Sequence, residues 1–204
     1  MGALMALLVI TICGIGYHQA QTALRESIEG EIAAVLNIEA EQLDAWMSRK
    51  VQRVESAANL VAALDGSPVE MEREIMSLAA TDKEVLDLAY GAEDGRFISW
   101  ADGNLTGEFD PLGRPWYQDA RAKGHTIVTE VYQDAISKKM VVTIASPYKG
   151  TDGAFRGVVC SDITLDALAD KVKDIKYHGI GQAIIVDPAG LIIASSEGLA
   201  MHKA

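Results

Sequence analysis

The sequence predicts a mixed α/β fold of the α+β kind, in which a long N-terminal helix precedes a mostly antiparallel sheet. Two periodicities carry this prediction. From Leu24 to Leu64, apolar residues recur at three- and four-residue steps, which is the pattern of an amphipathic helix. From about residue 82 onward the pattern changes to alternation, and short turns containing Gly and Asp separate the apolar runs, as expected for strands.

The composition limits the possible classes of protein. The chain has 204 residues, of which 49% are hydrophobic, so it is long enough for one good-sized domain or two small ones. Its net charge of −11 argues against nucleic acid or an anionic membrane surface as a partner. Cys13 and Cys160 lie in very different segments, so we expect no disulfide between them.

The sequence contains no recognisable catalytic or metal-binding pattern. The four histidines are scattered, and no pair of cysteines has the spacing of metal ligands. Phosphate loops, zinc-protease motifs and nucleophile elbows are also lacking from the sequence. We therefore expect no metal, no cofactor, no catalytic residues and no enzymatic activity.

The N-terminal segment is apolar. Met1 to Gly16 carry no charge, and the first charged residue is Arg25. About 16 apolar residues are slightly fewer than the roughly 20 that span a bilayer, but Tyr17 and the uncharged stretch to Ala23 complete the span at the interface. A signal peptide is the alternative, although a basic N-terminal region and a clear cleavage site are missing. Residues 1–23 are therefore predicted to be a partial transmembrane anchor.

Residues 24–66 are predicted to form a long amphipathic stalk helix. At ~1.5 Å per residue it would be a rod of roughly 60 Å. The run Asp65-Gly66-Ser67-Pro68 predicts its end, and a second helix is predicted from Pro68 to Thr81. The apolar stripe has two interpretations, coiled-coil dimerisation and packing against the sheet that follows.

The strands follow in order. Val85 to Tyr90 and Arg96 to Trp100 flank Glu93-Asp94-Gly95, which predicts a hairpin. Further strands are predicted over 126–133, 139–147 and 154–163, for a sheet of about five strands. The remaining residues predict a loop and short helix over 110–123, a helix over 164–174, and a last hairpin of 182–186 with 191–196.

The most informative segment is Phe109-Asp-Pro-Leu-Gly-Arg-Pro-Trp-Tyr117, in which two prolines and a glycine restrict the backbone. Arg114, Trp116 and Tyr117 offer a guanidinium, an indole N–H and a phenol, which together suit a carboxylate. A surface turn, with the aromatic rings in the core and Arg114 paired to a nearby Asp, is the alternative.

Two isolated carboxylates follow this segment, Asp134 and Asp162. A cationic cluster with two carboxylates is what a pocket for a zwitterion requires. Asp162 has a second interpretation, because it lies just before the helix expected near Thr164 and could cap it.

Five motifs occur in a familiar order: Asp110-Pro-Leu-Gly-Arg-Pro-Trp-Tyr117, Tyr132-Gln-Asp-Ala135, Val141-Val-Thr-Ile-Ala-Ser-Pro-Tyr148, Asp152-Gly-Ala-Phe-Arg-Gly-Val-Val159 and Asp162-Ile-Thr-Leu-Asp-Ala-Leu168. On these motifs the chain resembles the double Cache family of extracytoplasmic sensor domains, which occur in bacterial and archaeal chemoreceptors, sensor kinases and cyclic-dinucleotide enzymes. The resemblance implies a PAS-like, membrane-distal module over 67–174. It also implies that 175–204 is the truncated start of a membrane-proximal module.

One subgroup of this family binds amino acids, and the resemblance implies the roles of the site residues. Arg114, Trp116 and Tyr117 would contact the ligand carboxylate, while Asp162 and Asp134 would contact the ammonium. The subgroup has a Tyr where this chain has Phe109, which removes one hydrogen bond worth about 0.5–1.5 kcal/mol. The remaining pocket candidates are Tyr132 and Tyr90, although core packing is the favoured role of Tyr90.

The implied function is ligand sensing by the extracytoplasmic domain of a transmembrane receptor, chiefly a methyl-accepting chemotaxis protein, in the cell inner membrane. The sensor would be periplasmic or extracellular, would bind a small amino-acid-like or carboxylate ligand, and would form a homodimer through the long helix. The alternatives are an interaction or dimerisation module without a ligand, and the input domain of a sensor kinase or diguanylate cyclase.

Overall fold

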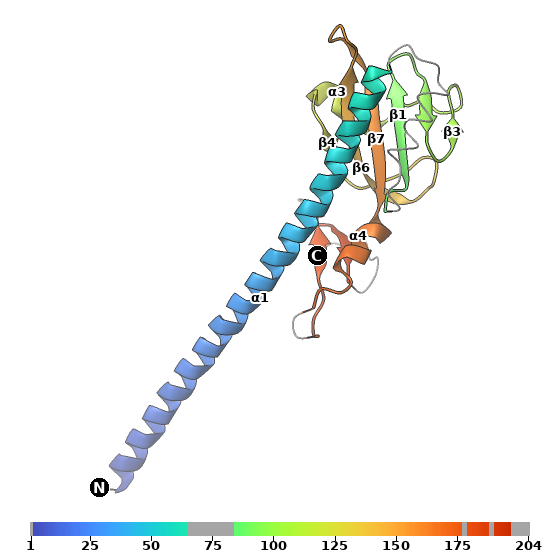
Figure 1. Ribbon diagram of the computed structural model, residues 1–204. Helices are drawn as coiled ribbons and strands as arrows, with labels where there is room; N and C mark the ends of the chain where they lie inside the picture. The colour runs from blue at the N-terminus through green and yellow to red at the C-terminus, as the bar shows by residue number, and fades with distance from the viewer. Residues whose placement is uncertain (1, 65–83, 177–178, 188–189, 197–204) are drawn as a thin grey trace.

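A computed structural model describes residues 2–64, 84–176, 179–187 and 190–196. Helix α1, Gly2–Ala63, is continuous over 62 residues, so it is about 90 Å long at ~1.5 Å per residue. Its C-terminal part lies along the sheet, and its N-terminal part projects well beyond it (Figure 1). The predicted boundary near residue 23 therefore does not interrupt the helix, and the helix predicted from Pro68 to Thr81 lies outside the described residues.

Among the described residues, no helix carries a stretch that is both long and apolar enough to cross a membrane. The anchor predicted for residues 1–23 stays a prediction.

A seven-stranded antiparallel sheet forms the body of the molecule. Its order is β3-β2-β1-β7-β6-β4, and β5 also pairs with β6. The strands are β1 Asp87–Ala92, β2 Phe97–Ser99, β3 Gly103–Asn104, β4 Ile127–Val128, β5 Tyr132–Gln133, β6 Met140–Lys149 and β7 Phe155–Thr164.

The predicted hairpin of β1 and β2 is confirmed, with Gly95 at φ 88° in its turn. The prediction of about five strands is too low for two reasons. The strand predicted over 126–133 is divided into β4 and β5. The two-residue strand β3 follows a turn and is too short to show alternation.

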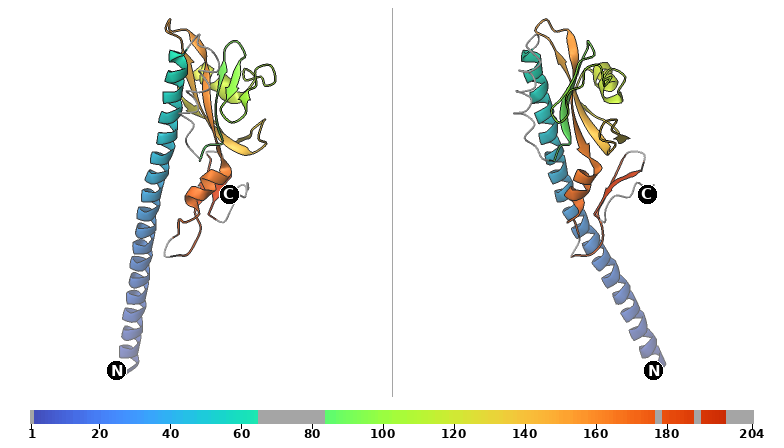
Figure 2. Two further views of the ribbon diagram at one scale, coloured as in Figure 1. Left: turned by 45° about the vertical axis from the view of Figure 1, so that its right-hand side comes forward. Right: turned by 90° about the vertical axis from the view of Figure 1, so that its right-hand side faces the viewer.

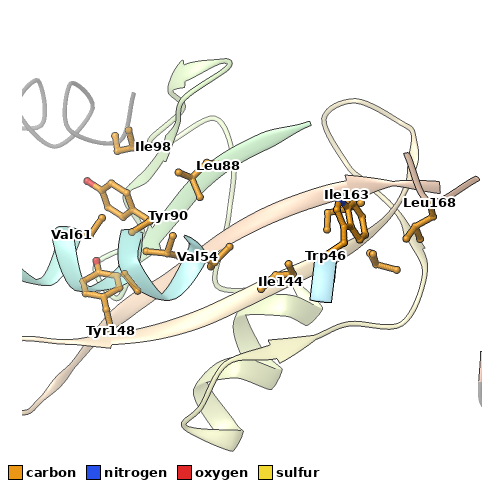
Figure 3. Packing of buried hydrophobic residues seen from close by; sticks show 14 of the residues in the cluster. Trp46, Val54, Val61, Leu88, Tyr90, Ile98, Ile144, Tyr148, Ile163 and Leu168 are labelled. Carbon is orange, nitrogen blue, oxygen red and sulfur yellow. The ribbon is translucent and has the colours of Figure 1, made fainter. Parts of the chain in front are cut away.

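Helix α1 covers one face of the sheet. Its buried residues Trp46, Val54, Ala58 and Val61 recur at helical spacing and pack on strand residues that include Tyr90 (Figure 3). Packing against the sheet therefore accounts for the C-terminal part of the apolar stripe. Nearer the N-terminus the stripe is less buried, because Leu24 and Ile28 are 62% and 38% accessible and Ile32 and Val35 are half-buried.

Helix α3, Pro115–Lys123, lies on the opposite face of the sheet from α1 (Figure 2). Its buried residues are Trp116, Tyr117 and Ala120. The helix begins at a proline and ends at Gly124, which has φ 70° and donates its N–H to Ala120. The sheet is thus enclosed between α1 and the segment that carries the sequence motif.

The C-terminal elements agree with the sequence prediction. Helix α4, Leu165–Val172, begins at Thr164, whose hydroxyl accepts a hydrogen bond from the Ala167 N–H at 3.2 Å. Strands β8, Ile184–Val186, and β9, Ile192–Ser195, form a separate antiparallel hairpin. Ala194 of β9 is buried in the same core as Leu168 and Val172 of α4.

Glu84 joins the start of the sheet to both α1 and α4. Its carboxylate accepts hydrogen bonds from Trp46 Nε1 at 2.7 Å and Lys50 Nζ at 2.8 Å, and it also pairs with Lys171. The Lys171 ammonium, followed by Lys50 and the Trp46 indole, lowers the pKa of Glu84 to about 2. Because Glu84 lies three residues before β1, this cluster fixes the strand that enters the candidate site.

Candidate ligand-binding site

The face of the sheet turned away from α1 carries a polar row beside a row of small residues. In the polar row, Asp87 of β1 lies opposite Asp162 of β7, which lies opposite Thr143 of β6. In the next row, Ala89 lies opposite Cys160, which lies opposite Ala145. Because successive strand residues alternate between faces, residues two apart in each strand share a face, so the two rows lie side by side. The small side chains leave room above the sheet.

A cavity of about 290 Å³ occupies that room. Three aromatic rings and four carboxylates line it, together with smaller residues of the sheet and of the loop after β5. The aromatic residues are Phe97, Phe109 and Trp116, and the acidic ones are Asp87, Asp102, Asp134 and Asp162.

The motif loop packs closely over this part of the sheet. Asp110 Oδ1 accepts a hydrogen bond from the Leu112 N–H at 3.0 Å, and the Arg114 N–H donates to the Pro111 carbonyl at 3.1 Å. A Cβ at Gly91 would lie 2.6 Å from Pro111 Cβ and 3.3 Å from Trp116 Cη2. Gly91 therefore allows the loop and the indole to lie directly on β1.

Phe109 contributes its ring to the wall of the cavity. The Phe109 ring packs on Phe97 with 4.4 Å between ring centroids. The guanidinium carbon of Arg114 lies 5.4 Å from the centroid of the Phe109 ring. Arg114 is half-buried at the N-cap of α3 and does not line the cavity. Within the described part of the chain its guanidinium has no carboxylate partner, so the expected alternative of a surface pair with a nearby Asp is not observed.

Asp134 and Asp162 line the same cavity, as the zwitterion interpretation requires. Asp134 Oδ2 accepts hydrogen bonds from the N–H groups of Ile136 at 3.2 Å and Ser137 at 2.5 Å. Asp162 Oδ1 accepts from the Thr143 hydroxyl. Among the described residues, no group donates to Oδ1 of Asp134 or Oδ2 of Asp162. Asp162 does not cap α4, because Thr164 does, so that alternative is wrong.

Tyr132 is linked to Asp162 through the hydroxyl of Thr143. Its hydroxyl lies 2.6 Å from Thr143 Oγ1, and it must be the donor there because the single Thr143 proton is directed to Asp162. Burial raises the pKa of Tyr132, which keeps the phenol protonated as this donation requires. Tyr132 itself is not part of the cavity wall.

Burial raises the pKa of Asp162 to about 7, against the lowering effect of the Thr143 hydrogen bond. The negative charges of Asp134 and Asp87 raise it further. Burial also raises the pKa of Asp87, which accepts hydrogen bonds from Ser99, Ala101 and Leu88. Among the lining residues that the structure describes, these carboxylates thus have no cationic partner.

Besides Arg114 and Tyr132, two more of the residues predicted for the site lie outside the cavity wall. Tyr90 is on the face covered by α1, where its ring packs edge-on against Tyr148 with 6.3 Å between centroids. The prediction that Tyr90 faces the pocket is wrong, because its position in β1 alternates with that of Ala89. Tyr117 is buried under α3 beside Phe155 and outside the cavity wall, and its hydroxyl has no hydrogen-bond partner among the described residues.

The sequence did not point to Asp87, Asp102 and Ser137 of the cavity wall, or to Thr143, which donates to Asp162. Asp87 had a signal in the sequence, since it is a charged residue between Leu86 and Leu88 in an otherwise apolar strand. Thr143 and Asp102 had none, because their relation to the cavity depends on strand register and on the turn after β2.

A family model, curated relatives and solved structures all relate the chain to the sensor domains of chemotaxis receptors. The double Cache family model, described as a Cache domain, matches residues 20–202. The methyl-accepting chemotaxis protein PscA of Pseudomonas syringae pv. tomato is 31% identical over 188 residues, which are 92% of this chain and 29% of PscA. The chain thus spans less than a third of the length of this relative.

Solved structures of ligand-binding domains are similar as well. The domain of the Pseudomonas fluorescens chemoreceptor CtaA in complex with L-serine has a TM-score of 0.67 and 26% identity, over 78% of this chain and 67% of that one. The domain of the Pseudomonas aeruginosa PAO1 amino-acid chemoreceptor PctB in complex with L-Gln has a TM-score of 0.64 and 27% identity, over 79% and 66%.

Proposed function

The chain belongs to the double Cache family of sensor domains, and on that basis we propose that it is the extracytoplasmic ligand-sensing part of a transmembrane chemotaxis receptor. The observation that carries the proposal is a cavity lined by Asp134 and Asp162, each with an unused carboxylate oxygen, and by the rings of Phe97, Phe109 and Trp116. Its role is binding rather than catalysis, and its ligand is a small amino acid or a related molecule.

The ammonium of the ligand lies between Asp134 and Asp162. An ammonium has three donors, and the two carboxylates offer Oδ1 of Asp134 and Oδ2 of Asp162 as acceptors. Tyr132 and Thr143 hold Asp162 in place for this contact. The amino acids bound by the similar CtaA and PctB domains support this class of ligand.

The ligand carboxylate is held by α3. Arg114 rests on the Phe109 ring at the start of this helix, and Trp116 already lines the cavity. A rearrangement of α3 that turns the Arg114 guanidinium and the Tyr117 hydroxyl toward the cavity would bring both to the carboxylate. An orphan buried hydroxyl costs about 1–3 kcal/mol, so the Tyr117 hydroxyl gains from acquiring an acceptor.

The signal passes through the sheet to α1. Residues Asp87 and Ala89 of β1 face the cavity, and the alternating residues Leu88 and Tyr90 pack in the core beneath α1 (Figure 3). A ligand that favours one position of β1 therefore favours one position of the helix. Glu84 ties the same strand to Trp46 of α1 and Lys171 of α4.

The part of α1 that projects beyond the sheet would contact a second copy of the chain and the membrane. The stripe residues Leu24, Ile28, Ile32 and Val35 lie on one side of α1, are exposed or half-buried, and suit a second copy of the helix in a homodimer. Residues 1–23 anchor the domain in the inner membrane, with the sheet outside the cytoplasm. The same stripe also supports the second candidate function, an interaction module that uses α1 and binds no small ligand.

Asp162→Asn is expected to weaken the binding of an L-amino acid at least about tenfold, or 1.4 kcal/mol, while its des-amino analogue loses far less. The reason is that the amide keeps the shape of the carboxyl but not its charge. In the wild type, affinity should also fall as the pH drops below about 7, because protonated Asp162 cannot hold an ammonium. Calorimetric titration over a range of pH measures both effects.

Asp119→Asn is the matched control, since Asp119 is on the exposed side of α3 and outside the cavity. It should bind like the wild type, and it should keep the pH dependence that Asp162→Asn loses. Equal losses for the amino acid and its des-amino analogue in Asp162→Asn would rule out the ammonium role of Asp162.

A further inference from the structure

We propose that the cavity selects amino acids whose side chain carries a second positive charge, and that Asp87 sets this preference. The inference rests on the proposed function, because it assigns a ligand class to the same cavity. It starts from residues that the ammonium and carboxylate contacts leave unused.

The charge balance of the cavity points to a second cation. Four carboxylates line it, and none of the described lining residues is Lys, Arg or His. The α-ammonium of a ligand meets Asp134 and Asp162, and the α-carboxylate meets Arg114. A ligand with a neutral side chain would leave Asp87 and Asp102 without a counter-charge in a partly buried space. A cationic side chain would supply that charge.

The geometry of Asp87 leaves it able to bind a ligand. Its Oδ1 accepts hydrogen bonds from the N–H groups of Leu88 at 2.8 Å and Ala101 at 3.1 Å, and its Oδ2 accepts from the Ser99 hydroxyl at 2.6 Å. A carboxylate has about four acceptor sites, so about one remains for a ligand. All three donors are neutral, and they leave the negative charge in place.

Asp102 and Asp87 are both hydrogen-bonded to the hydroxyl of Ser99. The Ser99 hydroxyl that donates to Asp87 accepts a hydrogen bond from the Asp102 N–H at 2.8 Å. Asp102 is exposed, whereas Asp87 is half-buried, so the pair extends from the cavity wall toward its rim. This position suits the end of a long side chain whose α-ammonium is held at Asp162, the residue opposite Asp87.

The alternative is that Asp87 only organises the turn after β2. Asn at this position separates the two roles. Its amide oxygen can accept from Leu88 and Ala101, and its amide nitrogen can donate to the Ser99 oxygen, so the turn keeps its hydrogen bonds. Only the negative charge is lost.

The experiment compares L-lysine with L-norleucine, which has the same carbon chain without the second ammonium. Calorimetric titration of the full 204-residue chain at neutral pH is expected to show L-lysine binding about tenfold tighter or more. In Asp87→Asn this ratio should fall at least about threefold, because L-lysine binding weakens more than L-norleucine binding does. Asp102→Asn should act in the same direction, and Asp119→Asn should leave the ratio unchanged.

The outcomes separate this inference from the proposed function. If L-norleucine binds as tightly as L-lysine, or another neutral amino acid binds more tightly than both, the preference for a second cation is refuted while amino-acid sensing stands. If L-lysine is preferred but Asp87→Asn and Asp102→Asn keep the wild-type ratio, the assignment to Asp87 is refuted. If none of the twenty standard amino acids binds, the proposed function fails and the inference fails with it.

Discussion

Arg114→Ala should lower the affinity for an amino acid about a hundredfold or more, or ~2.7 kcal/mol, while the midpoint of thermal unfolding stays close to that of the wild type. The guanidinium is the permanent cation at the start of α3, so the ligand carboxylate has no equal partner without it. The fold depends little on this side chain, because it is half-buried and its described contact is the face of Phe109. Calorimetric titration and thermal unfolding measure the two quantities separately.

Arg121→Ala is the matched control for this substitution. Arg121 lies on the same helix, stacks on Phe155 at 5.0 Å from its centroid, and pairs with Glu93 at 2.8 Å, outside the cavity wall. Its removal should leave the affinity unchanged. The account of Arg114 is wrong if Arg114→Ala lowers the unfolding midpoint by several degrees and keeps wild-type affinity.

Gly157→Ala should destabilise the fold by about 3 kcal/mol or more. A Cβ at this position would lie 2.2 Å from the Gly91 carbonyl oxygen and 2.9 Å from Ala92 Cα, and both are backbone atoms of β1. Backbone in the middle of a sheet cannot move away as a flexible side chain can. Strand β1 would have to shift toward Pro111 of the motif loop, which already contacts Gly91. Denaturant unfolding measures the loss.

Gly30→Ala provides the comparison. A Cβ at Gly30 meets nothing within 4 Å, and the residue is in the middle of α1. Alanine should therefore stabilise the helix by about 0.5–1 kcal/mol. If Gly157→Ala unfolds at the same denaturant concentration as the wild type, the close approach of β1 and β7 at this position is not as described.

The elements of this fold follow mostly from local sequence patterns. The period of α1, the turns at Gly95 and Gly153, and the cap at Thr164 are each contained in a few neighbouring residues. The division of the strand over 126–133 and the existence of β3 depend on partners elsewhere in the sheet. Short strands form because a neighbouring strand offers hydrogen bonds, which a single segment of sequence does not reveal.

The part of the site that lies within a sequence motif could be predicted from the sequence. The motif segment places Phe109 and Trp116 together on the cavity wall. The polar row of Asp87, Asp162 and Thr143 comes instead from strand register, which joins residues far apart in the chain. A shift of one residue would move each of them to the face under α1, as the position of Tyr90 shows. Register, rather than any local pattern, therefore decides which carboxylates share the cavity.

Binding of an amino acid in the cavity beside α3 should stabilise the folded chain. The most direct measurement is the thermal unfolding of the 204-residue chain with each of the twenty standard L-amino acids in turn. At least one of them is expected to raise the midpoint by several degrees, since a ligand at a hundredfold excess over its Kd stabilises the folded state by about 2.7 kcal/mol. An unchanged midpoint with all twenty would contradict the claim.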